Sequence, residues 1–127
     1  MTIKRIPATP AGPNDGPPYS NAVCANGFIF VSGQVGLDDE GRLAEGGIIA
    51  ETRQAIDNIG KILASAGSDL GHVVKATVWL IDPGDYKAFN QVYKDHFGAD
   101  LPARACVRSD LMGPYRVEIE VIATAKS

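Results

Sequence analysis

An arginine, a cysteine and two glutamates stand inside two otherwise apolar segments near the C-terminus of this 127-residue chain. Arg104 and Cys106 lie in the sequence LPARACV, and Glu118 and Glu120 lie in VEIEVIA. Burying a charge without a partner is costly, so such residues are either paired or used in chemistry. A guanidinium can bind a carboxylate bidentately, and a positioned glutamate can deliver water and transfer protons. The pattern indicates either a structural ion pair or a site for a small carboxylate-bearing molecule.

The residues alone leave both possibilities open for Arg104. A structural partner would be Glu118, Glu120 or Asp110. The two segments are neighbours in the sequence, which predicts that they pair as a hairpin. Side chains alternate along a strand, so we expect Glu118 and Glu120 on one face. On the residues alone, a structural ion pair is the simpler interpretation of the arginine.

Cys106 follows Arg104 by two residues, so both side chains should leave the same face of their strand. A nucleophilic thiol needs an activating base, and neither His72 nor His96 stands in a context that suggests one. We therefore interpret Cys106 as a small residue lining a pocket. The chain has no Cys/His spacing suited to zinc and no glycine-rich phosphate loop, so we expect no metal site.

Hydrophobic periodicity and turn residues predict the elements that position these side chains. Strands are expected over 3–6, 21–25, 28–33, 72–81, 103–107 and 117–125, and helices over 48–66 and 83–97, with an irregular loop over 8–18. Asn26-Gly27 predicts a hairpin turn, and Asp82 is expected to cap the second helix. The order of elements predicts one α+β domain over residues 1–127, with one sheet and two helices packed on one face.

The segment 72–81 is apolar on both sides, although two helices can cover only one face of the sheet. The expected faces carry Val74, Ala76, Val78 and Leu80 on one side and Val73, Trp79 and Ile81 on the other. The uncovered face needs a partner, and a homo-oligomer supplies one most simply.

Bulk properties exclude several classes of protein. The formal net charge is −3 and no basic face is evident, which argues against binding to nucleic acid. No run of about 18 apolar residues is present, so no membrane association is expected. The N-terminus lacks the apolar core of a signal peptide, which predicts a cytoplasmic protein with reduced cysteines.

Five motifs in order resemble the RidA/YjgF family of enamine/imine deaminases. They are Pro18-Tyr19-Ser20, Ser32-Gly33-Gln34, Asn90-Gln91-Val92-Tyr93, the segment 102–107 and the segment 117–123. The resemblance covers the chain from about Gly16 onward. It implies a chorismate-mutase-like fold, a homotrimer with active sites between subunits, and a final strand inserted centrally in a mixed sheet instead of the hairpin expected above.

The resemblance also implies an activity and roles for residues. The activity is hydrolysis of reactive 2-imino or 2-enamino acids, of the 2-aminoacrylate or 2-iminobutyrate type, to 2-keto acids and ammonia without a cofactor. Arg104 would hold the substrate carboxylate, Glu118 would handle water and protons, and Tyr19 would close the pocket. The remaining pocket residues would be Ser32, Gly33, Asn90 and Cys106. The alternatives are a non-catalytic trimeric binder or sensor of small carboxylates and, less well supported by the acidic composition, an endoribonuclease.

Overall fold

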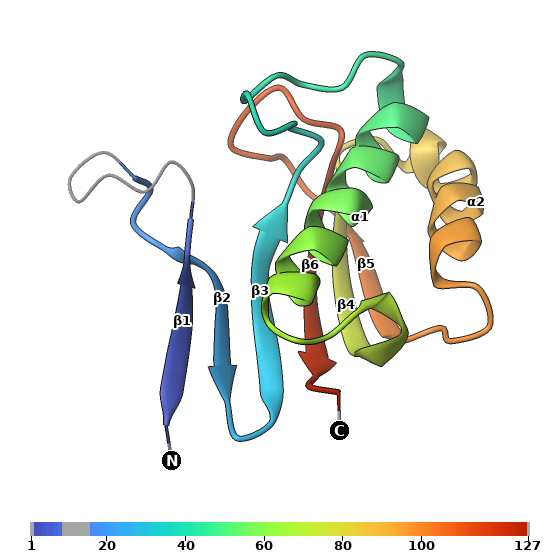
Figure 1. The fold of residues 1–127 in the computed structure, drawn as a ribbon. Coiled ribbons are helices and arrows are strands. Elements are labelled where there is room, and N and C mark those ends of the chain that lie inside the picture. Colours follow the sequence, from blue (N-terminus) through green and yellow to red (C-terminus); the bar gives the residue numbers. More distant parts are fainter. Residues whose placement is uncertain (1, 9–15, 127) are drawn as a thin grey trace.

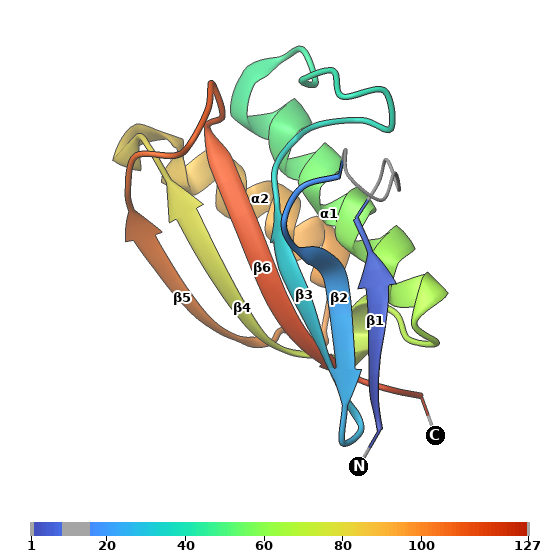
Figure 2. The ribbon, with the colours of Figure 1, turned by 90° about the vertical axis from the view of Figure 1, so that its left-hand side faces the viewer.

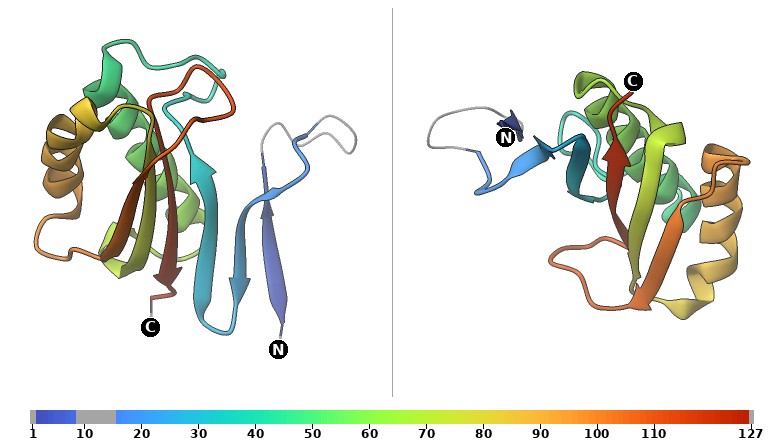
Figure 3. Two further views of the ribbon diagram at one scale, coloured as in Figure 1. Left: turned by 180° about the vertical axis from the view of Figure 1, so that it is seen from behind. Right: turned by 90° about the horizontal axis from the view of Figure 1, so that it is seen from below.

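Within residues 2–8 and 16–126, which this computed structural model describes, six strands form one sheet and two helices pack on the same face of it (Figures 1 and 3). The strands are β1 (Ile3–Pro7), β2 (Ser20–Ala25), β3 (Phe28–Gln34), β4 (Val73–Leu80), β5 (Ala103–Arg108) and β6 (Val117–Thr124). The helices are α1 (Gly47–Ser65) and α2 (Tyr86–Phe97), and two short 3-10 turns, η1 (Leu70–His72) and η2 (Pro83–Asp85), precede β4 and α2. The α+β class, with two helices on one face of one sheet, is confirmed. Residues 9–15 of the expected loop over 8–18 lie outside the described residues.

The strand order is β1-β2-β3-β6-β4-β5, and only β4 and β5 are parallel among these neighbours (Figure 2). The hairpin expected between the last two strands is therefore wrong. A parallel pair needs a crossover, and α2 supplies it between β4 and β5. β5 thereby occupies one side of β4, and β6 occupies the other side, where it also pairs with β3. The central position of the final strand, implied by the family resemblance, is confirmed.

Local sequence signals explain how several elements begin and end. Asn26 and Gly27 both adopt positive φ, 53° and 83°, as a two-residue hairpin turn between β2 and β3 requires. Asp82 caps the turn before α2, because its Oδ1 accepts a hydrogen bond from the Gly84 backbone N–H at 2.8 Å. The hairpin prediction is confirmed. Asp82 caps η2 and not the second helix itself, because α2 begins at Tyr86 with Asp85 at its N-cap. The hydrophobic core forms between the helices and the sheet, and its α1 members include Ala55, Ile56, Ile59, Ile62 and Leu63.

A β-bulge corrects the expected faces of β4. Val73 pairs with Ala123 but Lys75 pairs with Ile122, so the register shifts at Val74. The extra residue turns Val73 toward the helices and leaves Val74 43% exposed. The two valines do lie on opposite faces, as expected, but each lies on the face expected for the other. Ala76, Val78 and Leu80 are buried as expected.

The face of the sheet without helices is turned toward the viewer in Figure 2, and exposed apolar side chains lie on it. Phe28 and Phe30 are 41% and 45% exposed, and their ring centroids lie 6.4 Å apart. Val107 on β5 is 44% exposed and is paired in register with Trp79. Exposed apolar side chains on one face are a candidate contact surface for another molecule.

No helix in the described part of the chain is long and apolar enough to cross a membrane.

Candidate active site

Arg104 lies on the edge strand β5, on the face that the helices cover. Its register partner is Ala76, which is fully buried beneath the helices. The guanidinium reaches α2, where Nη1 donates to Asn90 Oδ1 at 2.9 Å and Nη2 donates to Tyr86 Oη at 3.2 Å. An amide and a hydroxyl, both neutral, therefore orient the cation.

Three aromatic rings of α2 also surround this cation. The Arg104 Cζ atom lies 4.9 Å from the ring centroid of Tyr93, 5.6 Å from that of Phe89 and 5.8 Å from that of Tyr86. Ring faces attract a guanidinium, so the rings stabilise its charge as well as its position. Sequence reasoning missed this contact, although the three aromatics recur at helical spacing, which is the signal that they share one face of α2.

Within the described residues, no carboxylate lies within 4.0 Å of the Arg104 guanidinium. Arg104 therefore does not form the ion pair with Glu118, Glu120 or Asp110 that the sequence alone favoured. Planar guanidinium groups match carboxylates bidentately, and this one carries its charge without such a partner. The arrangement is suited to binding an anionic ligand.

Cys106 shares the helix side of β5 with Arg104, since its register partner Val78 is buried there. Burial raises the pKa of the Cys106 thiol, and the nearby Arg104 charge opposes that shift only in part. A thiol with a raised pKa is a poor nucleophile near neutral pH. Cys106 instead forms part of a pocket of about 230 Å³, whose lining residues are Leu80, Pro83, Tyr86, Cys106, Val107 and Arg108.

Glu118 lies on the opposite, helix-free face of the sheet, in register with Trp79. Its carboxylate packs against Gly33, where a Cβ atom would overlap Glu118 Oε2. Burial raises the pKa of the Glu118 carboxyl, and the negative charge of Glu120 raises it further. A carboxyl with a raised pKa can exchange protons closer to neutral pH than an ordinary one.

A bulge in β3 produces this contact. The register of β3 with β6 shifts between Val31 and Gln34, so Ser32 and Gly33 together occupy the space of one residue. The Ser32 hydroxyl is directed to β2, where its Oγ donates to the Ser20 carbonyl at 2.6 Å. Ser32 therefore holds the bulge in place, and Gly33 provides the bare backbone beside the carboxylate.

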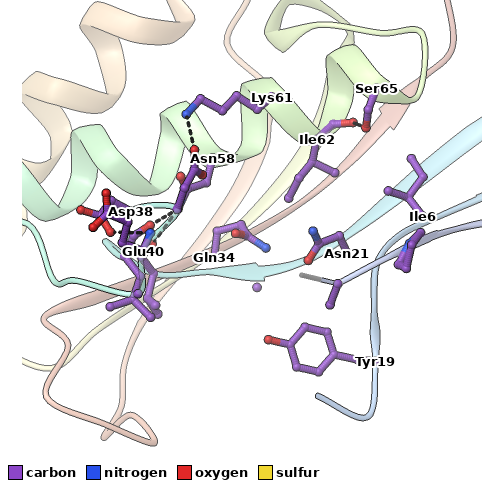
Figure 4. Close-up of a pocket in the computed structure, with 17 residues that line it drawn as sticks. Ile6, Tyr19, Asn21, Gln34, Asp38, Glu40, Asn58, Lys61, Ile62 and Ser65 are labelled. Atoms are coloured by element: carbon purple, nitrogen blue, oxygen red, sulfur yellow. Dashed lines mark hydrogen bonds and ion pairs between the residues drawn. The ribbon is translucent and has the colours of Figure 1, made fainter. Parts of the chain in front are cut away.

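Tyr19 lies at a second, larger groove of about 730 Å³ (Figure 4). No helix covers β1 and β2, which lie beside α1 (Figure 1), and residues of β1, β2 and α1 line the groove. Tyr19 is 54% exposed and faces Asn58 and Lys61 of α1 across the groove. Gly33 also lines this groove. Tyr19 and Gly33 thus share a concave surface, and Arg104, Cys106 and Asn90 form a separate group.

Arg104 and Glu118 are far apart within one chain. Arg104 and Glu118 lie on opposite faces of the sheet, two strands and three residues apart in register. Strand spacing and rise place their Cα atoms roughly 14 Å apart. A small ligand can contact both residues only if they come from different copies of the chain.

Among the described residues, no group of three or more His, Cys, Asp or Glu side chains is placed to hold a metal ion. The groups of the candidate site that could take part in chemistry are a guanidinium, a carboxylate of raised pKa, and polar backbone and side-chain groups.

Comparison with known proteins agrees with these features. Residues 10–125 match the family model described as endoribonuclease L-PSP. The chain is 46% identical to the 2-iminobutanoate/2-iminopropanoate deaminase of Capra hircus and 42% identical to that of Homo sapiens, in each case over 95% of this chain and 90% of the relative. A crystal structure of a YjgF family protein from Neisseria meningitidis superposes with a TM-score of 0.84 at 36% identity, covering 100% of this chain and 98% of that one. The chain therefore belongs to the endoribonuclease L-PSP family, which is also the RidA/YjgF family.

Proposed function

We propose that this protein is a hydrolytic deaminase that converts reactive 2-imino and 2-enamino acids, of the 2-aminoacrylate or 2-iminobutyrate type, to 2-keto acids and ammonia. The observation that carries the proposal is the Arg104 guanidinium, which neutral groups orient and no carboxylate of the described residues neutralises. Every substrate of this class has a carboxylate beside the reacting carbon. The identity of 42–46% with deaminases over nearly the whole chain supports the same reaction.

The reaction needs only water, proton transfer and a fixed substrate. Arg104 binds the substrate carboxylate and so orients the C=N bond. The oxygen of the attacking water bonds to the imine carbon while Glu118 accepts a proton from that water. The imine nitrogen takes up a proton in the same addition. The resulting carbinolamine breaks its C–N bond, ammonia leaves, and the C=O bond forms. One imine and one water thus give one 2-keto acid and one ammonia, with no cofactor and no metal in the scheme.

The remaining residues shape the pocket in this proposal. Asn90 orients Arg104 while facing the substrate, and Cys106 lines the wall beside it. Gly33 permits the substrate to approach the backbone next to Glu118. Tyr19 closes the site from the neighbouring groove.

We propose a homotrimer in which Arg104 of one copy and Glu118 of the next line a shared site. Two observations support it: these residues face opposite sides of one sheet, and the helix-free face exposes Phe28, Phe30 and Val107. Residues 1–127 would form one domain of this trimer, and the protein would act in the cytoplasm on small molecules.

The decisive test is steady-state kinetics with 2-iminobutyrate or 2-iminopropionate generated in a coupled assay. Arg104→Ala is expected to abolish activity, because the substrate loses its anchor. Full activity of that variant would refute the assignment. Glu118→Gln separates an enzyme from a binder or sensor: it should retain affinity for 2-oxobutyrate, measured by calorimetry, while losing turnover. A wild-type protein that binds 2-oxobutyrate but never turns over the imine would be a binder.

The description of the family model favours a second candidate, cleavage of RNA. The net charge of −3 opposes it, because RNA binding depends on neutralising phosphates. Ribonuclease activity that falls away with further purification, while deaminase activity stays constant, would dismiss this candidate. Ribonuclease activity that follows the protein and disappears in Arg104→Ala would establish it.

A further inference from the structure

A second arginine stands at the far end of the pocket beside Cys106. Arg104, Cys106 and Arg108 are alternate residues of β5, so their side chains leave the strand on the same side. Arg108 lines the pocket of about 230 Å³, and its register partner is the buried Leu80. The edge strand β5 thus carries two cations. Arg104 is proposed to bind the substrate carboxylate, and Arg108 lies four residues further along.

The pocket adjoins Arg104 through Tyr86, which contacts both. The Tyr86 hydroxyl accepts the hydrogen bond from Arg104 Nη2, and the same residue lines the pocket together with Cys106. The other walls are the apolar residues Leu80, Pro83 and Val107. A small molecule whose carboxylate binds Arg104 would thus lie beside a largely apolar pocket that Arg108 also lines.

Arg108 itself is exposed and uncommitted. Within the described residues its side chain makes no hydrogen bond, and no carboxylate lies within 4.0 Å of it. The two acids of the neighbouring turn are occupied elsewhere: Asp82 accepts from the Gly84 backbone, and Asp85 pairs with Arg116 at 3.2 Å. The charge of Arg108 is therefore available to a ligand.

The size of the pocket limits that ligand. A volume of about 230 Å³ corresponds to roughly eight water molecules at about 30 Å³ each. It accommodates a side chain of a few heavy atoms. The Cα atoms of Arg104 and Arg108 lie roughly 13 Å apart along the strand. Arg104 is held in place by α2, so the flexible side chain of Arg108 would lean toward a molecule bound there.

We propose that this pocket receives the substrate side chain and that Arg108 binds a second carboxylate at its end. The enzyme then favours imino acids derived from acidic amino acids, that is, four- or five-carbon 2-imino dicarboxylates. This inference rests on the proposed deaminase function, and it adds the substrate class. Arg104 recognises what all substrates share, and Arg108 distinguishes among them.

The test compares two imines in one assay. 2-Iminoglutarate and 2-iminobutyrate are generated in situ by amino-acid oxidases acting on glutamate and 2-aminobutyrate, and imine loss is followed by trapping with semicarbazide. The measured quantity is the ratio of kcat/KM for the dicarboxylate to kcat/KM for 2-iminobutyrate. Arg108→Gln should lower this ratio about fivefold or more, mainly through a higher KM for the dicarboxylate, because an exposed ion pair of about 1 kcal/mol is lost.

The matched control is Arg53→Gln, which replaces an exposed arginine of α1 that lines neither pocket. Its ratio should equal that of the wild type. An unchanged ratio in Arg108→Gln, with 2-iminobutyrate still hydrolysed by the wild type, overturns this inference and leaves the deaminase proposal standing. Failure of the wild type on both imines overturns the deaminase proposal, and this inference falls with it. A thermal melt of each variant confirms that both remain folded.

Discussion

Arg104 is unusual among strand arginines because neutral groups alone hold it. Asn90 Oδ1 and the Tyr86 hydroxyl orient the guanidinium, and the Tyr93 ring lies 4.9 Å from its Cζ atom. A structural arginine at this position would normally be paired with a carboxylate. In the proposed function the substrate carboxylate supplies the missing counter-ion, so activity should depend strongly on Asn90, which orients Arg104.

Two variants of Asn90 test this interpretation. Asn90→Ala removes one hydrogen bond to the charged group and should lower kcat/KM for 2-iminobutyrate roughly tenfold or more. Asn90→Asp has nearly the same shape but introduces the missing carboxylate beside Arg104. It should lower kcat/KM further than the alanine variant, because the new carboxylate competes with that of the substrate. If Asn90→Asp were as active as the wild type, Arg104 would not be the anchor.

The ionisation of Glu118 predicts the shape of the pH profile. Burial and the charge of Glu120 raise the pKa of this carboxyl above the ordinary value of about 4.3. As the pH falls through the raised pKa, Glu118 becomes protonated and can no longer accept a proton from water. The activity, measured as kcat/KM, should therefore be lost on the acid side at a higher pH than for an ordinary carboxyl.

Glu120→Gln should move this acid limb to lower pH, because it removes the neighbouring negative charge. Glu45→Gln, which changes an exposed glutamate ahead of α1, is the control and should leave the limb in place. If the acid limb of the kcat/KM profile lies at the same pH in Glu120→Gln as in the wild type, another group controls it.

At the scale of elements, the bulge in β3 brings backbone and carboxylate together. The register shift between Val31 and Gln34 places Gly33 directly against Glu118, and the Ser32 hydroxyl fastens the bulge to β2. Bulges commonly re-aim residues beside active sites. Strand alternation alone would have placed Gly33 on the helix side, so the surroundings of the proposed catalytic carboxylate depend on this irregularity.

Gly33→Ala tests the role of the bulge. The added Cβ would overlap Glu118 Oε2, which is the end of a flexible side chain and can move away. The free energy of unfolding should therefore change by less than about 1 kcal/mol, but a displacement of about 1 Å can reduce kcat/KM roughly a hundredfold.

The control for this variant is Gly60→Ala within α1, where the nearest atom to an added Cβ is Leu70 Cγ at 4.0 Å. Replacing a helical glycine should raise the free energy of unfolding by about 0.5–1 kcal/mol and leave activity unchanged. Chemical denaturation and steady-state kinetics on both variants separate the two effects. Full activity in Gly33→Ala would show that Glu118 tolerates displacement.

At the scale of the whole molecule, the sheet separates the two principal site residues. Arg104 faces α2, Glu118 faces the side without helices, and their Cα atoms lie roughly 14 Å apart. The exposed Phe28 and Phe30 lie on the same side of the sheet as Glu118. Assembly of copies through that face would both cover the aromatics and complete the site.

Mixing inactive variants tests such a composite site. Arg104→Ala and Glu118→Gln are each expected to be inactive alone. When they are co-expressed with different tags and purified through both tags, each mixed cyclic trimer has about one third of its interfaces combining an intact arginine with an intact glutamate. Activity should return to about that fraction of the wild-type value. Mixed oligomers without activity would place both residues of each site in one chain, and light scattering on the wild type should give the mass of three chains.

Local patterns in the sequence determined much of this protein. The period of apolar residues located α1 and α2 to within a few residues. Asn26-Gly27 predicted the hairpin between β2 and β3, and Asp82 predicted a cap just before α2. These features depend on neighbours close in the chain, so the sequence displays them directly. The types of Arg104 and Glu118, charged residues in apolar strands, likewise mark them as candidate site residues in the sequence itself.

Only the tertiary structure decided how these parts are combined. Strand order depends on pairing between distant segments, so the hairpin expected from proximity gave way to a central β6 with β4 between it and β5. The bulge at Val74 exchanged the sides of two valines, because one inserted residue shifts the alternation. Most importantly, the placement of Arg104 and Glu118 on opposite faces follows from the registers of both strands with β4. The sequence marked Arg104 and Glu118 as the residues proposed to carry the chemistry, and the sheet placed them on opposite faces of one chain.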